Sequence, residues 1–291
     1  MNTVQVQPQS QRAVGYLMLF LAATFWAMTG VMGLAVKKAG VGPMEVAFWR
    51  ALIGGGLFII HALLTNNYKV ATRDRLIFMA FGLPGVAILF YGFQLGVQEV
   101  GMAMATMLQY TSTAWIVVWG VVFFKEQLTI WKVLAAAMAI TGAIVLCLAG
   151  GNISATITFA GVAGSLISGI CYSLHSPFGK KYMQNYSPIS IYMHTMPIGA
   201  LCMLPFVTFA PKTPEIWAWL VGLSIVTVWA AYWCYCEGVK RIEVSKVGVI
   251  CSIEPVIAAM IGMTFFAESF TVMGGAGALF IIAGVFLTLK K

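Results

Sequence analysis

Ten apolar runs separated by short polar breaks make up most of this sequence. A helix needs about 20 apolar residues to cross the hydrocarbon core of a bilayer, and each run is about that long. The runs place helical spans at residues 14–36, 44–64, 75–96, 101–123, 130–149, 158–179, 188–209, 215–236, 246–266 and 271–289. We therefore expect an all-α integral membrane protein with ten transmembrane helices and short connections.

Charged residues are too scarce for a soluble domain. Asp, Glu, Lys and Arg make up 9% of the chain, against roughly a quarter of an ordinary soluble domain. A large soluble catalytic domain is therefore excluded. The formal net charge of +8 does not indicate nucleic acid as a partner, because no basic face is available to bind phosphates. The expected surroundings are a lipid bilayer.

The basic residues are divided unevenly between the two sides that ten spans define. The side with both termini carries Arg12, Lys69, Arg73, Arg75, Lys125, Lys132, Lys180, Lys181, Lys240, Arg241, Lys246, Lys290 and Lys291. The other side carries Lys37, Lys38 and Lys212. Short loops rich in Lys and Arg stay in the cytoplasm. We therefore expect a multi-pass protein of the cell's inner (plasma) membrane with both termini, including the tail 1–13, in the cytoplasm.

All six cysteines fall within the predicted spans, at Cys147, Cys171, Cys202, Cys234, Cys236 and Cys251. An oxidising compartment would not readily reach them there, so we interpret them as small core residues. Cys234 and Cys236 are two residues apart on a helix and so face different ways, which argues against a shared metal ion. No metal and no cofactor is predicted.

The chain repeats itself with an offset of 142 residues over three consecutive spans. The matching pairs are Gly96 with Gly238, Val97 with Val239, Glu126 with Glu268, Thr129 with Thr271 and Gly142 with Gly284. Earlier in the chain the offset is 145 or 146, which pairs Pro43 with Pro188 and Trp26 with Tyr172. We predict a five-helix repeat over 14–149, a linker over 150–157 and a second repeat over 158–291. Since five is odd, the second repeat is inverted, an arrangement typical of alternating-access transporters.

Several local motifs accompany this repeat. They are Phe25-Trp26, Arg50, Glu254-Pro255, Phe124-Lys125-Glu126-Gln127-Leu128, Phe266-Ala267-Glu268-Ser269-Phe270, Gly142 and Gly284. With the two five-helix halves, these motifs make the chain resemble the EamA-type members of the drug/metabolite transporter superfamily. The resemblance implies a ten-helix carrier of amino acids, amines, nucleotide precursors or other metabolites. The first repeat has Ser112-Thr113 where the second has Glu254-Pro255, so we expect the two halves to differ in how their central helix bends.

Polar and small residues recur every three or four positions along the sixth span. The face consists of Ser165, Ser168, Gly169, Tyr172, His175, Ser176 and Gly179. Helix packing explains the Ser and Gly positions equally well, whereas Tyr172 and His175 fit a cavity wall better. Trp26 lies on the equivalent face of the first span. Trp26 and Tyr172 should therefore approach from opposite sides of the pseudo-axis as two aromatic walls, which suit an ammonium group or an apolar side chain.

Three further spans contribute candidates for binding a substrate. The third and fourth spans present neutral hydrogen-bonding groups, namely Tyr91, Gln94, Gln109 and Ser112. Aromatic side chains surround the eighth span so completely that some must touch lipid, and from these we select Trp229 and Trp233.

Ionisable side chains inside the spans are candidates for coupling or charge balance. Glu254 lies roughly 12 Å along its helix from Lys246 and close to the midplane. It either titrates, as proton coupling would require, or is held in a structural network beside Pro255. Arg50 either balances Glu254 or a substrate carboxylate, or snorkels to the headgroups. His175 and His194 could carry a proton near neutral pH, although a buried, neutral, hydrogen-bonded histidine is the commoner case.

Glu126 and Glu268 are predicted on opposite faces of the membrane, so they cannot act together. Each precedes a helix N-terminus that Thr129 or Thr271 can cap, and a structural role is expected for both.

These features favour a secondary active transporter, not an enzyme. The expected substrate is a small amphipathic metabolite, such as an amino acid or amine, with protons as a candidate coupling ion and export as the direction. The alternatives are a non-transporting membrane scaffold and an intramembrane enzyme, although no nucleophile or metal cluster supports the latter. A monomer and a homodimer both fit.

Overall fold

A computed structural model describes residues 9–149, 157–266 and 271–289. The first half contains α1 (Gln9–Lys38), α2 (Pro43–Leu64), α3 (Thr72–Gly82), η1 (Leu83–Ile88), α4 (Leu89–Val100), α5 (Met102–Gln109), α6 (Ser112–Phe124) and α7 (Ile130–Ala149). The second half contains α8 (Phe159–Ser173), α9 (His175–Tyr182), α10 (Pro188–Met203), η2 (Leu204–Phe206), α11 (Pro214–Ser224), η3 (Ile225–Ala230), α12 (Ala231–Arg241), α13 (Val244–Cys251), α14 (Glu254–Phe266) and α15 (Val272–Leu289).

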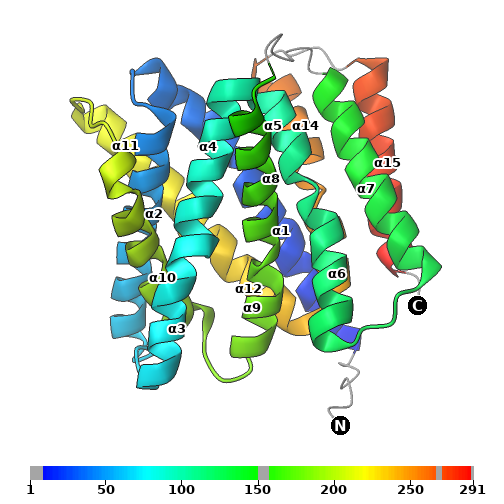
Figure 1. Cartoon of the computed structure of the whole chain (residues 1–291), viewed down its shortest axis with the longest axis horizontal. Coiled ribbons are helices and arrows are strands. Elements are labelled where there is room, and N and C mark those ends of the chain that lie inside the picture. Colours follow the sequence, from blue (N-terminus) through cyan, green and yellow to red (C-terminus); the bar gives the residue numbers. More distant parts are fainter. Residues whose placement is uncertain (1–8, 150–156, 267–270, 290–291) are drawn as a thin grey trace.

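Among the described residues, eight segments are long and apolar enough to cross a membrane. The broken segment α8–α9 and the shorter apolar helix α15 run alongside them (Figure 1), which gives ten crossings. Every predicted span coincides with one of these segments to within a few residues. The predicted all-α membrane fold is confirmed.

The elements of the two halves recur at the offset found in the sequence. The segment η1 begins 142 residues before η3, α5 before α13, and α6 before α14, with identical lengths in each pair. Proline at the first position starts α2, α10 and α11, where its missing N–H would have no helical partner. The repeat is therefore present in the backbone itself and includes the π-helical segments η1 and η3.

The predicted difference between the central helices is wrong. The helix breaks after Gln109 in the first half and after Cys251, its counterpart, in the second. The Thr111 hydroxyl donates to the carbonyl oxygen of Leu108 at 2.7 Å. Such a local side-chain bond competes with the helical ladder. A helix break therefore forms in the first half even without the proline that follows Glu254.

The halves differ instead in their first crossing. The helix α1 is continuous over 30 residues, whereas its counterpart is divided at Leu174 into α8 and α9. Pro177 lies just after this division, and a proline ring clashes with the carbonyl four residues earlier. Its counterpart in α1 is Val31, which imposes no break.

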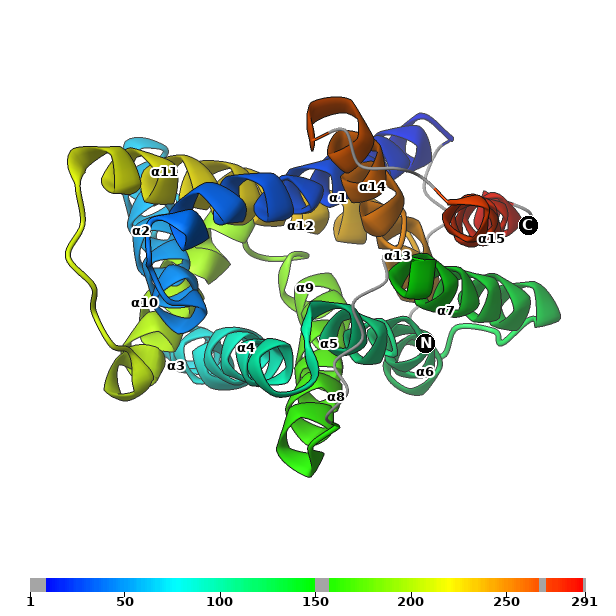
Figure 2. The ribbon, with the colours of Figure 1, turned by 90° about the horizontal axis from the view of Figure 1, so that it is seen from above.

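Small residues bring the paired helices close together. A Cβ on Gly142 of α7 would lie 2.6 Å from the carbonyl oxygen of Gly277 in α15. A Cβ on Gly284 of α15 would lie 2.9 Å from the carbonyl oxygen of Ala135 in α7. This close approach is typical of membrane helices, and it places α7 and α15 side by side at one edge of the molecule (Figure 2).

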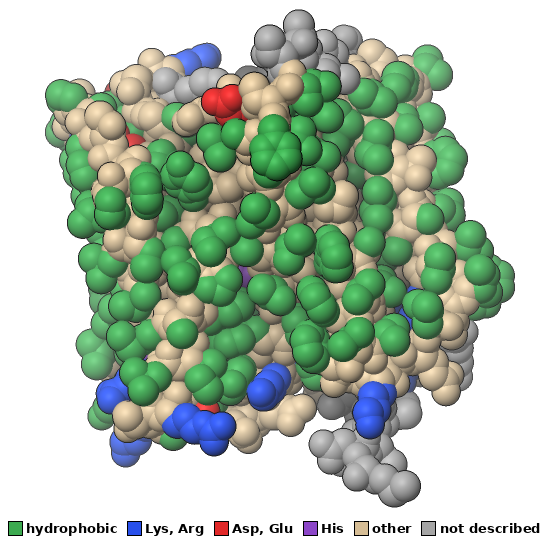
Figure 3. Space-filling view, in the orientation of Figure 1, with side chains coloured by type: hydrophobic (Ala, Val, Ile, Leu, Met, Phe, Trp, Pro, Cys, Tyr) green, Lys and Arg blue, Asp and Glu red, His purple; other side chains and the backbone are tan. Residues whose placement is uncertain are grey.

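We call the end where α1 begins and α15 ends the proximal end, and the other the distal end. On the face shown in Figure 3, Lys and Arg gather along the proximal edge, and the surface between the two ends is mostly apolar. This separation of basic and apolar surface is the one expected of a protein with loops on the two sides of a bilayer.

Candidate functional site

Trp26 stands at the centre of a layer of aromatic rings. Its ring centroid lies 5.9 Å from that of Tyr172, 5.6 Å from Tyr232 and 5.3 Å from Tyr235. The predicted approach of Trp26 and Tyr172 is thus confirmed. The two rings touch edge to face, however, and Trp26 is only 7% exposed. In this conformation the two rings pack against each other instead of lining an open cavity.

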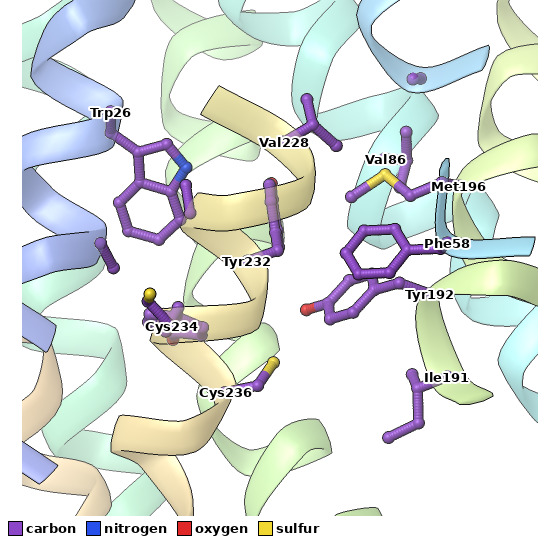
Figure 4. Close-up of a cluster of buried hydrophobic side chains, with 14 of the residues drawn as sticks. Trp26, Phe58, Val86, Ile191, Tyr192, Met196, Val228, Tyr232, Cys234 and Cys236 are labelled. Carbon is purple, nitrogen blue, oxygen red and sulfur yellow. The ribbon is translucent and has the colours of Figure 1, made fainter. Parts of the chain in front are cut away.

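Tyr232 extends this layer across the molecule. In Figure 4 it lies between Trp26 of α1 on one side and Phe58 of α2 and Tyr192 of α10 on the other. The ring centroids of Tyr192 and Tyr232 are 5.0 Å apart, and Phe58 stacks on Tyr192 at 5.5 Å. We call Trp26, Tyr172, Tyr192, Tyr232 and Tyr235 the aromatic layer.

His175 is buried against this layer and has partners at both ring nitrogens. Its Nε2 lies 2.7 Å from the carbonyl oxygen of Gly85 in η1, and its Nδ1 lies 2.9 Å from the Tyr192 hydroxyl. Because a carbonyl oxygen only accepts, Nε2 must carry a hydrogen. The structure matches the alternative of a buried, hydrogen-bonded histidine, and His175 joins η1, α9 and α10 instead of facing an open cavity.

Arg50 and Glu254 are the two charged candidates predicted deep inside the spans. Arg50 donates through Nε to the Thr227 hydroxyl at 3.1 Å, and its guanidinium lies 5.6 Å from the ring centre of Phe90. The side chain therefore points into the protein, and the snorkelling alternative is wrong.

Glu254 is the first residue of α14 and is partly exposed. Within the part of the chain that the structure describes, its carboxylate has no hydrogen bond or ion pair. Arg50, Tyr110, Tyr172, Tyr232 and Cys251 are the charged or titratable groups in electrostatic range of it. No structural network of hydrogen bonds therefore holds Glu254 among the described residues. Its carboxylate is available to a cationic ligand or a proton.

The neutral polar candidates differ in whether their side chains are already bonded or buried within the protein. Gln109 donates through Nε2 to the Ser168 hydroxyl at 3.0 Å, and Ser168 donates to the Leu89 carbonyl oxygen at 2.9 Å, so both tie α8 to the first half. Ser112, the counterpart of Glu254, is buried. Gln94 remains half-buried on α4.

Tyr91 lies at the distal end, away from the aromatic layer. It lines a cavity of about 200 Å³ together with Met44, Leu95, Gln98 and Phe206. A second cavity of about 490 Å³ lies beside the distal end of α1, between Ala35 and Trp219. Neither cavity reaches Trp26 or Glu254, so Tyr91 and Glu254 belong to separate places in this conformation.

Three predicted residues make no ring contact with the aromatic layer. Trp233 is exposed on α12, Trp229 packs its ring against His61 at 5.5 Å, and His194 bonds through Nδ1 to its own helix at the Ser190 carbonyl. The sequence reasoning missed Tyr232 and Tyr235, which occupy the buried side of the same helix. The spacing of Tyr235 and Gly238 could have identified that side, because Gly238 packs against Leu19 of α1.

The proximal and distal halves are closed to different degrees. A Cβ on Gly30 or Gly33, in the distal half of α1, would meet no atom within 4 Å. Their counterparts in the proximal half are Ser176, which is fully buried, and Gly179, where a Cβ would lie 3.0 Å from Met183. The face of α9 around Ser176 and Gly179 is therefore packed in the proximal half, whereas the face of α1 around Gly30 and Gly33 meets open space in the distal half.

The central helices show the same difference. In the proximal half α6 packs along α13. Their counterparts in the distal half are α14 and α5, and among the described residues no comparable packing joins them. In the view from above, α5 and α14 lie apart from each other (Figure 2).

Glu126 has the structural role that was expected, but at a different helix. Thr129 caps α7 by accepting from the Lys132 amide at 3.4 Å. The Glu126 carboxylate caps α13 of the other half, accepting from the amides of Val244 at 2.7 Å and Ser245 at 3.1 Å. Glu268 lies outside the described residues.

The cysteines are free thiols, as predicted, and four of the six are buried. The described residues contain no group of His, Cys, Asp or Glu arranged to hold a metal ion.

Comparison with known proteins gives a consistent result. The model of the EamA-like transporter family matches residues 13–148 and again 159–290. An uncharacterized transporter of Archaeoglobus fulgidus is 22% identical over 95% of this chain and 99% of its own length. The uncharacterized inner membrane transporter YicL of Salmonella typhimurium is 22% identical over 94% of each chain.

A solved crystal structure superposes with a TM-score of 0.81 at 18% identity, covering 96% of this chain. It shows the same fold. With the two family matches it defines the class of protein, a multi-pass membrane transporter built from two repeats. The chain belongs to the EamA-like transporter family.

Proposed function

We propose that the protein is a secondary active transporter that exports a small amphipathic metabolite, an amino acid or an amine, by alternating access. The observation that carries the proposal is the carboxylate of Glu254 at the start of α14, which has no hydrogen bond or ion pair within the described part of the chain. An ionisable group at this depth is costly and usually functional. Aromatic faces attract an ammonium group and also bind apolar side chains. Arg50 supplies a counter-charge for a substrate carboxylate.

Protons are the coupling ion in this proposal. A lone ionised carboxylate is unfavourable inside a membrane, so Glu254 holds either a proton or a substrate ammonium group. The two compete for the same oxygens. A proton that enters from the distal side releases the amine there, so proton entry drives export.

The proximal end faces the cytoplasm of the cell in this proposal. The basic residues gathered there support that orientation, because short loops rich in Lys and Arg remain on the cytoplasmic side of an inner membrane. The structure then represents a carrier open to the outside.

The proposal is tested with purified protein in proteoliposomes. Radiolabelled amino acids and amines are offered with and without an imposed pH gradient. We expect one class to cross faster than in empty vesicles, and faster still with the gradient. Glu254→Gln should abolish the response to the gradient, because the amide cannot exchange a proton. Glu215→Gln is the matched control, since Glu215 is exposed at the distal start of α11.

Two results would contradict the proposal. In the first, no amino acid or amine exceeds the leak of empty vesicles. In the second, Glu254→Gln transports with an unchanged response to pH. Ligand-induced thermal stabilisation across a metabolite panel, repeated with Trp26→Phe, measures binding independently of transport, because a ligand that binds the folded state raises its stability.

A further inference from the structure

The closed proximal half is fastened by one carboxylate that reaches from the first repeat to the second. Glu126 follows α6, and its side chain is 8% exposed. One carboxylate oxygen accepts from the Val244 amide at 2.7 Å. The other accepts from the amide and the hydroxyl of Ser245 and lies 3.4 Å from the Lys132 ammonium nitrogen. Every oxygen thus has a partner, and the first turn of α13 is held to the loop after α6.

The backbone before Glu126 is shaped to deliver this side chain. Lys125 adopts the left-handed conformation, with φ of 53°, and the Glu126 amide donates back to the Gly120 carbonyl oxygen at 3.1 Å. Glycine would ordinarily occupy such a position at a helix end. Gly120 leaves room for the contact, because a Cβ there would lie 2.9 Å from Glu126 Oε2 and 3.1 Å from the Ser245 amide nitrogen.

The segment that Glu126 holds is fixed from its other side as well. Lys180 of α9 donates to the carbonyl oxygens of Val239, Lys240 and Ile242 at the end of α12. A cation therefore sits at the C-terminus of α12 and an anion at the N-terminus of α13, each matching the helix dipole. Lys180 belongs to the same repeat as these helices, whereas Glu126 belongs to the other repeat. Of these two residues, Glu126 is the one that joins the repeats.

The inverted repeat shows which contacts change when the carrier turns over. Exchanging the conformations of the two halves would give the distal pair α14–α5 the packing that α6–α13 has now, and would separate α6 from α13. The Glu126 contact spans that pair. At the N-terminus of α5 the counterparts of Val244 and Ser245 are Met102 and Ala103, and the counterpart of Lys132 is Gly274. A fastening with the same hydroxyl and ammonium groups cannot form there.

We propose that Glu126 is a positioning residue for transport, a latch that holds the proximal side shut and must release α13 before that side opens. The inference rests on the proposed alternating access. Because α6 packs along α13 while their distal counterparts do not pack together among the described residues, the carrier rests closed on the proximal side. Weakening the latch shifts the resting population toward the proximally open state.

The native cysteines report this shift without any substrate. Cys236 is buried in the proximal half, in the same cluster of buried side chains as Tyr192. In lipid nanodiscs, a charged maleimide should label Cys236 at least tenfold faster in Glu126→Gln than in the unmodified chain, a shift of about 1.4 kcal/mol. Gly120→Ala, which displaces the carboxylate without removing it, should act in the same direction. In a Gly30→Cys background the distal thiol should label more slowly once Glu126 is changed.

Glu243→Gln is the matched control. Glu243 is the residue next to α13 and pairs with Lys132 at 3.0 Å, but it does not bind the amides of α13. Labelling of Cys236 should change less than twofold in this variant. Cys147, half-buried on α7 away from the latch, reports unfolding.

Two outcomes would overturn the latch. One is an unchanged labelling rate of Cys236 in both Glu126→Gln and Gly120→Ala. The other is an equal rise at Cys236 and Cys147, which would show that Glu126 only stabilises the fold. Faster labelling of Cys236 in a protein that carries neither amino acids nor amines would instead leave the latch standing and refute the proposed substrate class.

Discussion

The proximal and distal halves contain equivalent helices in inverted order, yet they are packed differently. In the proximal half Phe58, Tyr192 and Tyr235 are at most 2% exposed, and Tyr192 fixes the ring of His175. In the distal half the face of α1 around Gly30 meets open space, and Glu254 has no hydrogen bond or ion pair among the described residues. Equivalent sequence positions therefore support two packings, as a carrier that alternates between two states requires.

The difference also separates two kinds of side chain. Tyr192, Tyr235 and His175 have hydrogen-bond or ring partners in the proximal half. In the proposed function the ligand binds at Arg50 and Glu254, which we place at the boundary between the two halves. Substitutions in the proximal half should accordingly change stability, whereas substitutions at the boundary should change binding.

The largest expected difference comes from removing one ring on each side. Tyr192→Ala should lower the free energy of unfolding by about 3–5 kcal/mol, because it leaves a cavity in a close-packed layer. Tyr91→Ala removes a ring that is 37% exposed at the distal end, and should cost about 1 kcal/mol or less. Thermal unfolding of the two variants in the same detergent measures the difference. Equal losses would show that the distal half is packed as tightly as the proximal half.

Adding a methyl group on each side should have opposite effects. A Cβ on Gly238 of α12 would lie 2.5 Å from Leu19 of α1, so Gly238→Ala should destabilise the protein by about 1–3 kcal/mol. Gly30→Ala meets open space, and alanine is favoured over glycine in a helix by about 0.5–1 kcal/mol. The apparent unfolding temperature should therefore fall in the first variant and rise in the second. A fall in both would refute an open distal face on α1.

Removing a hydroxyl from each side should separate stability from binding. Tyr235→Phe removes the partner of the buried Ser176 hydroxyl at 2.6 Å and should cost about 1 kcal/mol of stability. Tyr110, beside Glu254, has no hydrogen bond through its hydroxyl among the described residues. Tyr110→Phe should leave the ligand-free unfolding temperature unchanged and reduce the shift that a bound ligand produces. If Tyr110→Phe lowered the ligand-free unfolding temperature and Tyr235→Phe did not, the assignment of Tyr110 to binding and of Tyr235 to stability would be wrong.

The sequence predicted the spans, the repeat and the meeting of Trp26 with Tyr172, because each depends on a periodic pattern. It did not predict the helix break after Gln109, since the local bond from Thr111 has no strong signature. It also did not predict which side of α12 is buried. Aromatic residues cover all of that helix, and a bilayer removes the contrast between polar and apolar faces that identifies buried positions in soluble proteins.

The smallest expected effect concerns the ionic contact at the proximal surface, where water screens charges. Burial raises the pKa of Glu243, but the hydrogen bond and charge of Lys132, with Lys246 and Arg12, outweigh it and hold the pKa below its usual value. The folded state therefore binds this proton less readily than the unfolded chain does. The stabilisation from Glu243 is present above the unfolded pKa and is lost as the pH falls through the folded one.

A partly exposed pair of this kind contributes about 0.2–1 kcal/mol. Glu243→Gln should therefore be slightly less stable than the unmodified protein at pH 7, and the gap should close at acidic pH, when both carry a neutral side chain. Unfolding temperatures of the two proteins between pH 7 and pH 3 measure this. If the difference in unfolding temperature persists at pH 3, the Glu243 side chain stabilises the protein through packing. The ion pair with Lys132 would then contribute nothing measurable to the proximal half.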